Sequence, residues 1–376
     1  MSTTFGRELG RAVAAAGSGA ATPLRLVLLE LLERRLETIA ARAHPKATML
    51  PFRPAYSVKT NPRPAFLRAA RAAGFLAETI SPAEVAAARE AGYPCGDIIY
   101  NGPRPCRRAE LDAPLGAAFA DSLEALALYL AERPAALVGV RLRPAAVPSR
   151  FGIPFDEVPD AAALMRAAEP GLTVGASMHV RSEDYRPRTW LELAGSFVDS
   201  AAALARESGR SLAVLDLGGG WTPASLERVL EHDVPALRLL LGSVLPGLTT
   251  VIVEPGQSVS TPCEALLCSV LEVRAGRGEA VVDAGFSELP HLETYPHRMY
   301  WAADGMLAPV ERGAGRILGP LCLEYDVVAR DVALPDGLAP GDRLVIADCG
   351  SYDASMAFPF AGGARHEVAP AGERHR

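Results

Sequence analysis

A regular alternation of strand-like and helix-like segments constrains the fold of this chain more than any other feature. Up to about residue 255, short apolar runs such as 55–58, 97–100 and 117–120 are each followed by a longer amphipathic stretch. Alternation of this kind is typical of parallel βαβ units. About eight such units in roughly 230 residues favour a closed (β/α)8 barrel over an open sheet.

Individual helices within this region carry their own signals. Ser81, followed by Pro82 and Glu84, combines an N-cap residue, a proline at the first helical position and an early carboxylate. Apolar spacing predicts helices over 190–208 and 224–241. The leucines and isoleucines of 24–43 also recur at helical spacing, and we expect one helix there.

The pattern of predicted secondary structure changes after residue 258, from alternating strands and helices to mostly strands. Runs 259–273, 280–283, 327–332 and 343–347 are predicted strands, with turn signals and few helices between them. We therefore expect two domains. The first is a barrel over residues 25–258, and the second is a mainly antiparallel β domain over 259–376 that includes part of 1–24.

Composition and charge exclude several classes of function. The 376 residues are 49% apolar and 22% charged, which excludes wholesale disorder. The net charge of −6 argues against a nucleic-acid or anionic-membrane surface, because phosphates are bound mainly by excess Lys and Arg. No apolar run reaches the roughly 18 to 20 residues of a spanning helix, so no membrane partner is expected.

The cysteines and the N-terminus predict a cytoplasmic protein. The six cysteines are scattered without a CxxC pair, and Cys263 and Cys268 have no companion ligands at zinc spacing. We interpret them as reduced thiols and predict no metal site. Residues 1–10 carry charge and have no apolar core, unlike a secretory signal.

Polar residues stand where predicted strands end, the place where barrel enzymes carry their chemistry. Lys59 follows 55–58 and is either solvated at the rim or directed into the barrel mouth, where a desolvated lysine can attack an aldehyde. His179 ends another strand and is either structural or available to a flat ligand. A glycine triplet after 212–217 suits an anion, and Glu254 ends a further strand. Together these groups match the needs of pyridoxal phosphate.

The ordered motifs extend this match along nearly the whole chain. The sequence resembles the fold-type III pyridoxal-phosphate decarboxylases, the group of ornithine, arginine and diaminopimelate decarboxylases, from about residue 22 to 363. The resemblance implies a (β/α)8 TIM barrel of the alanine-racemase type with a second β domain. It rests on the motifs 55–61, 78–81 with Glu84, 100–102, 121–122, 150–153, the His179 strand, 218–220, 254–256, 319–322 with Asp326, 341–342 and 350–352.

The resemblance assigns roles to individual residues. Lys59 is expected to carry the cofactor as a Schiff base, and Glu254 to keep the pyridine nitrogen protonated. His179 is expected to stack on the ring. Cys322 is expected to protonate the substrate carbon after CO₂ leaves, reaching in from the second subunit of a homodimer. The other expected cofactor contacts are Glu78, Arg141, Ser182, Gly218, Gly219, Gly220, Gly256, Gln257 and Tyr352.

Four positions depart from the family pattern. Gln257 replaces an arginine that usually follows Glu-Pro-Gly. Leu323 stands where diaminopimelate decarboxylases place an acid after the catalytic cysteine, and Pro296 where they place an arginine. Trp301 stands where ornithine decarboxylases place an aspartate. The acids that relatives use to hold a distal amino group are therefore missing.

These departures predict an unusual substrate. Arg181, His297 and Arg298 are either solvated rim residues or cations that recognise additional carboxylates. We predict an anionic amino-acid conjugate, such as the citryl conjugate of 2,3-diaminopropionate in the siderophore-biosynthesis branch. Diaminopimelate or an ornithine-type diamino acid is the alternative. The expected substrate contacts are His297, Arg298, Tyr300, Glu324 and Asp326.

A racemase and two kinds of non-catalytic relative are alternatives to a decarboxylase. Racemases of this fold keep the pyridine nitrogen unprotonated with an arginine, which Glu254 argues against. A cofactor-carrier protein would lack the β domain that we expect here. An inhibitor-type relative would have lost its lysine or phosphate contacts, and only Gln257 hints at such a loss.

Overall fold

The computed structural model describes residues 3–43, 50–144, 147–181, 189–295, 297–303, 305–361 and 368–369. The chain divides into two compact units. One comprises Arg35–Ser258. The other joins Met1–Arg34 to Val259–Arg376, and we call it the sheet unit. This division places residues 25–34, which we expected with the barrel, in the sheet unit.

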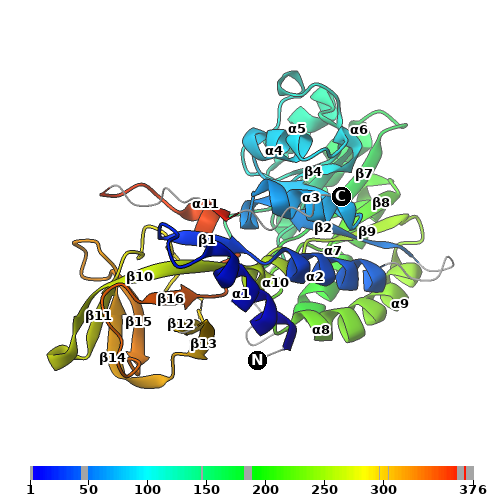
Figure 1. The fold of residues 1–376 in the computed structure, drawn as a ribbon. Helices are drawn as coiled ribbons and strands as arrows, with labels where there is room; N and C mark the ends of the chain where they lie inside the picture. Colours follow the sequence, from blue (N-terminus) through cyan, green and yellow to red (C-terminus); the bar gives the residue numbers. More distant parts are fainter. Residues whose placement is uncertain are drawn as a thin grey trace. The chain divides into compact units, whose positions relative to one another are not determined.

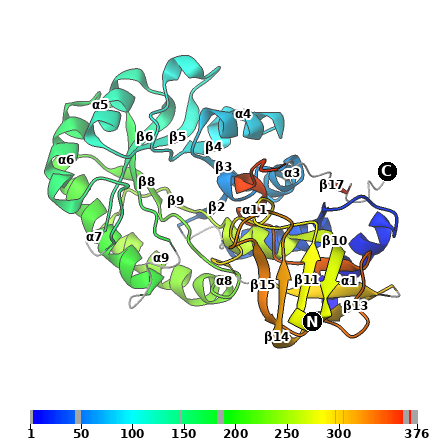
Figure 2. The same ribbon diagram turned by 90° about the vertical axis from the view of Figure 1, so that its left-hand side faces the viewer.

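The unit Arg35–Ser258 is built on a closed barrel of parallel strands, which confirms the predicted fold class (Figure 2). The ring closes where the first strand pairs with the last, Phe52 opposite Val251. In chain order the described strands are β2 Phe52–Ser57, β3 Leu76–Thr79, β4 Ile98–Tyr100, β5 Leu115–Ala120, β6 Ala135–Arg141, β7 Thr173–Ser177, β8 Leu212–Asp216 and β9 Thr250–Val253.

Helices on the outside of the barrel follow their strands along the chain (Figure 2). They are α3 Pro64–Ala72, α4 Pro82–Glu90, α5 Leu123–Glu132, α6 Val158–Ala167, α7 Trp190–Ser208, α8 Leu226–Arg228 and α9 Val234–Val244. The predicted start of α4 is confirmed, because Ser81 Oγ accepts a hydrogen bond from the Glu84 amide at 3.2 Å. The helix predicted over 224–241 contains a π-helical turn at Val229–Asp233. Among the helices that can be described, none combines the length and the apolarity needed to cross a bilayer.

Side chains fill the interior of the barrel. Phe119 on β5 lies against Gly139 on β6, where a Cβ would come within 2.4 Å of the Phe119 ring. It packs with apolar residues of the other strands, including Leu76, Ile99 and Ile252. A large ring opposite a glycine is one way to fill a tapering barrel core.

The sheet unit contains a nine-stranded, mainly antiparallel sheet in its described residues. Two pairs are parallel, β11 with β14 and β1 with β17. The strands are β1 Leu24–Val27, β10 Glu264–Arg274, β11 Glu279–Val282, β12 Met299–Ala303, β13 Met306–Pro309, β14 Arg312–Leu318, β15 Val327–Val332, β16 Arg343–Ile346 and β17 Val368–Ala369. The helices that begin in or flank this unit are α1 Thr3–Ala16, α2 Leu29–Ala43, α10 Gln257–Ser260 and α11 Asp353–Met356.

The single helix predicted over 24–43 is wrong. Residues Leu24–Val27 form strand β1, which pairs with β10, and only Leu29–Ala43 is helical (Figure 1). All four residues of β1 are buried, so the strand lacks the alternation that would have distinguished it from a helix. The strand predicted over 259–273 also begins later, because a helical segment precedes β10 at Glu264.

A buried ion pair connects β1 to β10. Arg25 Nη1 lies 2.7 Å from Glu264 Oε1, and both side chains are fully buried. The Arg25 Nη2 group also donates to the backbone oxygen of Glu288 at 2.6 Å. Removal of one partner would leave the other charge buried and unpaired, which is costly in a low-dielectric interior.

We expect Arg25→Met to lower the free energy of unfolding by about 3–5 kcal/mol, because Glu264 loses its counter-charge. The exposed Arg34→Met, which removes a pair with Glu30, should cost less than about 1 kcal/mol. Chemical denaturation of the two variants measures the difference. Arg25→Met combined with Glu264→Met should recover much of the loss, and equal effects of the two single arginine variants would contradict this account.

Candidate active site

A lysine and a buried glutamate meet where β2 and β3 end. Lys59 lies in the short helical turn Val58–Thr60 that follows β2, and its Nζ is 2.6 Å from Glu78 Oε2. Ser57 Oγ donates to the same oxygen at 2.5 Å. The Glu78 side chain is 1% exposed and that of Lys59 is 23% exposed. The lysine is therefore held in place by an ion pair while its amine still reaches open space.

A second carboxylate, Glu254, follows β9 and is almost fully buried. Its Oε1 accepts a hydrogen bond from Asn101 Nδ2 at 2.5 Å, and its Oε2 lies 3.1 Å from His179 Nδ1. Burial alone would raise the pKa of Glu254. The hydrogen bond from His179 and the charges of His179 and Lys59 outweigh burial and lower this pKa to about 2. Glu254 is therefore a carboxylate at neutral pH.

The pKa of Asp216, at the end of β8, is shifted in the opposite direction to that of Glu254. Burial and the negative charge of Glu254 raise the pKa of Asp216 well above its usual value. Its side chain accepts hydrogen bonds from the Gly218 amide at 2.9 Å and from Asn101 Nδ2 at 3.2 Å. The surroundings therefore favour a negative charge on Glu254 and disfavour one on Asp216.

These residues open onto a cavity of about 600 Å³ at the carboxyl ends of the strands. Arg141 lies 3.6 Å from Asp121, and the ring of Phe151 has Arg141 and Arg150 at 5.1 and 4.1 Å from its centre. The cavity is lined by Lys59, Glu78, Ile80, Asn101, Pro103, Arg141, Pro148, Ser149, Arg150, Phe151, Ser177, Met178, His179, Arg181 and Glu254.

Close packing requires the glycines next to this cavity. A Cβ on Gly219 would lie 2.1 Å from the Glu254 backbone oxygen, and one on Gly256 would lie 2.3 Å from Thr60 Oγ1. The Gly218 and Gly219 amides donate to Asp216 Oδ1 and to His179 Nδ1. Gly220 has a φ of +83°, which favours glycine. The proposed phosphate contacts of this triplet and of Gly256 and Gln257 stay predictions.

The remaining expected residues belong to the sheet unit. Cys322 and Glu324 are exposed on the loop between β14 and β15. Asp326 is buried, and its carboxylate accepts hydrogen bonds from the Leu321 amide at 2.7 Å and the Phe286 amide at 2.6 Å. Asp326 therefore organises the loop that carries Cys322. Tyr352 directly precedes α11 with a φ of 65°.

Three predicted substrate contacts are engaged within the sheet unit itself. The His297 side chain is 3% exposed, and its Nε2 lies 2.9 Å from Asp353 Oδ2. Arg298 donates two hydrogen bonds to Asp348, at 2.6 and 2.7 Å. Tyr300 is 4% exposed. Burial of His297 and Tyr300 and neutralisation of Arg298 by Asp348 argue against direct contacts of these residues with a substrate.

Sequence reasoning missed several residues that the structure places in the cavity. Asn101 directly follows β4 and Ser177 ends β7, so the signal that identified Lys59 and Glu254 applied to them as well. Asp216 ends β8 and carries the same signal; it is not part of the cavity lining but accepts a hydrogen bond from Asn101. Arg150 lay within a motif already noted but had no assigned role. Ser182 and Pro296 lie outside the described residues.

Comparison with known proteins places the chain in a family. A model of the pyridoxal-dependent decarboxylase pyridoxal-binding domain matches residues 36–261, and one of the C-terminal sheet domain of the same enzymes matches residues 176–350. The chain belongs to the pyridoxal-dependent decarboxylases. It is therefore a pyridoxal-phosphate-dependent enzyme that acts on an amino acid.

Several relatives are diaminopimelate decarboxylases. The enzyme of Deinococcus radiodurans is 30% identical over 81% of this chain and 80% of its own length. That of Archaeoglobus fulgidus is 27% identical over 94% and 88%. The solved structure of the Helicobacter pylori enzyme complexed with L-lysine superposes with a TM-score of 0.75 at 20% identity, covering 91% and 89%.

The residues of the cavity fit pyridoxal phosphate. A half-buried lysine, an ionised glutamate and an imidazole face one space. Ser177 Oγ and Asn101 Oδ1 line the same space and have no hydrogen-bond partner among the described residues. Buried polar atoms without partners indicate that a further polar group completes the site.

We expect Glu254→Gln to lower kcat by about 10²–10³-fold while the cofactor stays bound, because a neutral amide cannot stabilise a protonated pyridine nitrogen. The steady-state rate and the cofactor content per chain measure both effects. Glu124→Gln on the barrel's outer helix α5 is the control and should leave both unchanged. An unchanged kcat in Glu254→Gln would assign the role to another group.

Proposed function

We propose that this enzyme removes the α-carboxylate of an amino acid that carries a second carboxylate at its distal end, with diaminopimelate as the first candidate. The observation that carries this proposal is the set of guanidinium groups of Arg141, Arg150 and Arg181 on the wall of the cavity. Arginine recognises a carboxylate with two parallel hydrogen bonds. The relatives named as diaminopimelate decarboxylases support this candidate.

The charges of the cavity favour an acidic substrate. Glu78 is paired with Lys59, and Glu254 accepts hydrogen bonds from Asn101 and His179. The acids of the described lining are thus engaged with groups of the site itself. The field that a substrate meets is therefore positive. Such a field favours diaminopimelate, whose two carboxylates balance its two ammonium groups, over lysine or ornithine, which carry a net positive charge.

A citryl conjugate of 2,3-diaminopropionate, a substrate of siderophore biosynthesis, is the second candidate. Leu323 and Trp301 favour it, because neither can hold a distal ammonium. The pairing of Arg298 with Asp348 and the burial of His297 weaken the argument that these two cations recognise the carboxylates of such a conjugate. Recognition of such a conjugate would instead depend on Arg150 and Arg181.

The proposed mechanism assigns a role to each barrel residue. Lys59 would hold the cofactor, and Glu78 would orient its amine before the cofactor binds. Glu254 would keep a proton on the pyridine nitrogen, and His179 would pack against the ring. The bound pyridoxal phosphate supplies an electron sink for the bond that releases CO₂. Burial and the charge of Glu254 raise the pKa of Asp216, which would reduce the negative charge that stands beside Glu254.

Cys322 would complete the reaction from the partner subunit. The exposed thiol would return a proton to the α-carbon after CO₂ leaves, and Asp326 would position its loop through the Leu321 amide. This arrangement requires a homodimer in which each site takes residues from both chains. Tyr352 and Ser182 are proposed phosphate contacts on the same family resemblance.

Release of CO₂ from a panel of amino acids tests the substrate class. With diaminopimelate we expect a kcat/KM near ~10⁴ M⁻¹s⁻¹, an ordinary enzyme value, and far slower turnover of ornithine, lysine and arginine. Arg150→Ala should raise the KM for the dicarboxylate about tenfold or more, because it removes binding energy worth at least ~1.4 kcal/mol. Arg68→Ala, on the exposed face of α3, is the matched control.

The panel also separates the candidates. Turnover of the citryl conjugate alone would favour the second candidate over diaminopimelate. Preference for lysine or ornithine, with Arg150→Ala without effect, would contradict recognition of a distal carboxylate altogether.

A mixing experiment tests the shared site. Lys59→Ala and Cys322→Ala should each be inactive. Equimolar mixing should restore up to about a quarter of the wild-type activity, since half of the chains pair as heterodimers and each heterodimer has one intact site. Subunit exchange is verified with two distinguishable tags. Demonstrated exchange without any recovery of activity would refute the composite site.

A further inference from the structure

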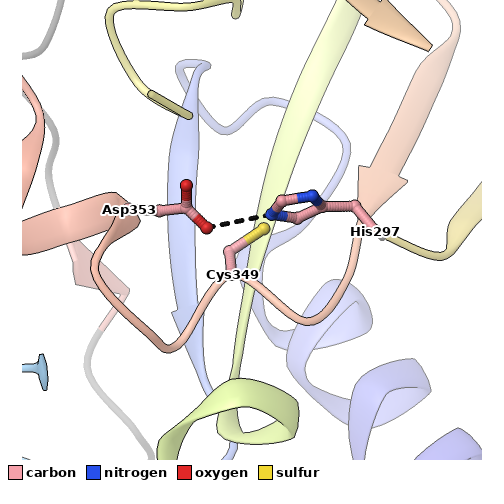
Figure 3. Close-up of side chains that lie close together, drawn as sticks. All are labelled: His297, Cys349 and Asp353. Atoms are coloured by element: carbon pink, nitrogen blue, oxygen red, sulfur yellow. Dashed lines mark hydrogen bonds and ion pairs between the residues drawn. The ribbon is translucent and has the colours of Figure 1, made fainter. Parts of the chain in front are cut away.

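A histidine, a cysteine and an aspartate converge inside the sheet unit, and none of the three is among the residues of the barrel site. Figure 3 shows His297, Cys349 and Asp353 directed toward one another from the segment before β12, the segment after β16 and the start of α11. One ligand atom of each residue, a ring nitrogen of His297, Sγ of Cys349 and a carboxylate oxygen of Asp353, lies within 4.8 Å of the other two. The three side chains are almost completely buried.

Two polar atoms of this trio lack the partners that buried atoms normally have. His297 Nε2 is 2.9 Å from Asp353 Oδ2, but Asp353 Oδ1 and His297 Nδ1 have no hydrogen-bond partner among the described residues. In the part of the chain that the structure describes, Cys349 Sγ donates toward two backbone oxygens, at 3.0 Å to Ile346 and 3.6 Å to Ala347. Orphaned buried atoms next to a thiol suggest that a ligand belongs among them.

We propose that His297, Cys349 and Asp353 bind a zinc ion. Imidazole nitrogen, thiolate sulfur and carboxylate oxygen are the ligands that Zn²⁺ accepts in proteins, at about 2.0–2.3 Å. Tetrahedral zinc would hold such atoms roughly 3.3–3.7 Å apart. The separations run from 2.9 Å between His297 and Asp353 up to at most 4.8 Å, so side-chain adjustments of up to about 1 Å bring the three ligand atoms into this range. A water or backbone oxygen can take the fourth position.

The charge balance of the region suits a divalent cation. Arg25 is paired with Glu264, and Arg298 with Asp348, so the nearby charges outside the trio are already compensated. Binding releases the Cys349 proton to solvent and leaves one thiolate and one carboxylate around Zn²⁺. The resulting cluster is neutral, and a neutral cluster is the form that a buried environment tolerates.

The positions of Cys349 and Asp353 in the sequence suggest that the ion has a structural role. Cys349 and Asp353 flank the segment 350–352, which contains the proposed phosphate contact Tyr352. Tyr352 has a left-handed backbone that is strained for a tyrosine. An ion that links both ends of this segment to His297 would hold it in that conformation, and it would act as a structural rather than a catalytic metal.

Metal analysis of the tag-free full-length enzyme tests the proposal. After chelation and reconstitution, we expect about one Zn²⁺ per chain, and X-ray absorption should show one sulfur at about 2.3 Å with nitrogen or oxygen ligands. Co²⁺ in its place should give a thiolate-to-metal absorption band. Cys349→Ala should abolish the band, whereas Cys268→Ala, equally buried in the same unit and outside the trio, should retain it.

Further measurements keep the test decisive if Cys349→Ala fails to fold. Asp353→Asn preserves the shape of the side chain and should weaken zinc binding by about 10-fold or more, because a neutral amide is a poorer ligand than a carboxylate and loss of an outer-shell partner alone costs about 10–100-fold. Removal of zinc from the wild-type enzyme should lower its melting temperature, and zinc alone should restore it.

Two results would overturn the proposal. One is a zinc content below about a tenth of an equivalent after reconstitution, far from the stoichiometry of a structural site. The other is bound zinc without sulfur that Asp353→Asn leaves unchanged, which would be adventitious. Weaker binding of pyridoxal phosphate after zinc removal is a separate readout that rests on the proposed role of Tyr352. Its failure would count against that role alone, because zinc content is measured independently.

Discussion

The parallel barrel determines where all the chemistry of this chain can occur, because its eight strands end at one mouth. Lys59, Glu78, Asn101, His179 and Glu254 come from segments up to 195 positions apart, yet each follows or ends a strand of the same ring. Hydrogen bonds between strands and the packing of Phe119 against Gly139 hold the ring rigid. A site built on such a frame is preorganised before any ligand arrives.

Within that mouth, electrostatics separates two neighbouring acids. Asp216 and Glu254 share Asn101 as a hydrogen-bond donor, but only Glu254 also faces His179 and the charge of Lys59. The cations stabilise one negative charge, and burial disfavours a second one beside it. The barrel mouth thus holds one persistent carboxylate, Glu254, beside an acid on which a negative charge is disfavoured.

Much of the barrel site could be predicted from sequence, because position after a short apolar run is a local signal. Lys59, His179 and Glu254 were identified in this way. Strand β1 was not, since four buried residues show no periodicity, and its partner Glu264 is far along the chain. The ion pairs of His297 with Asp353 and of Arg298 with Asp348 could not be predicted from sequence either, because the partners are brought together only by the tertiary structure. No local spacing predicts the trio of His297, Cys349 and Asp353.

The pairing of β1 with β10 has a consequence for the order in which the chain can fold during synthesis. Leu24 lies opposite Leu267, so β1 cannot pair with β10 until the whole of the barrel between them has been made. The unit Arg35–Ser258 is complete before that and can form its closed barrel in the interval. Until β10 appears, β1 exposes apolar residues and Arg25 lacks its counter-charge.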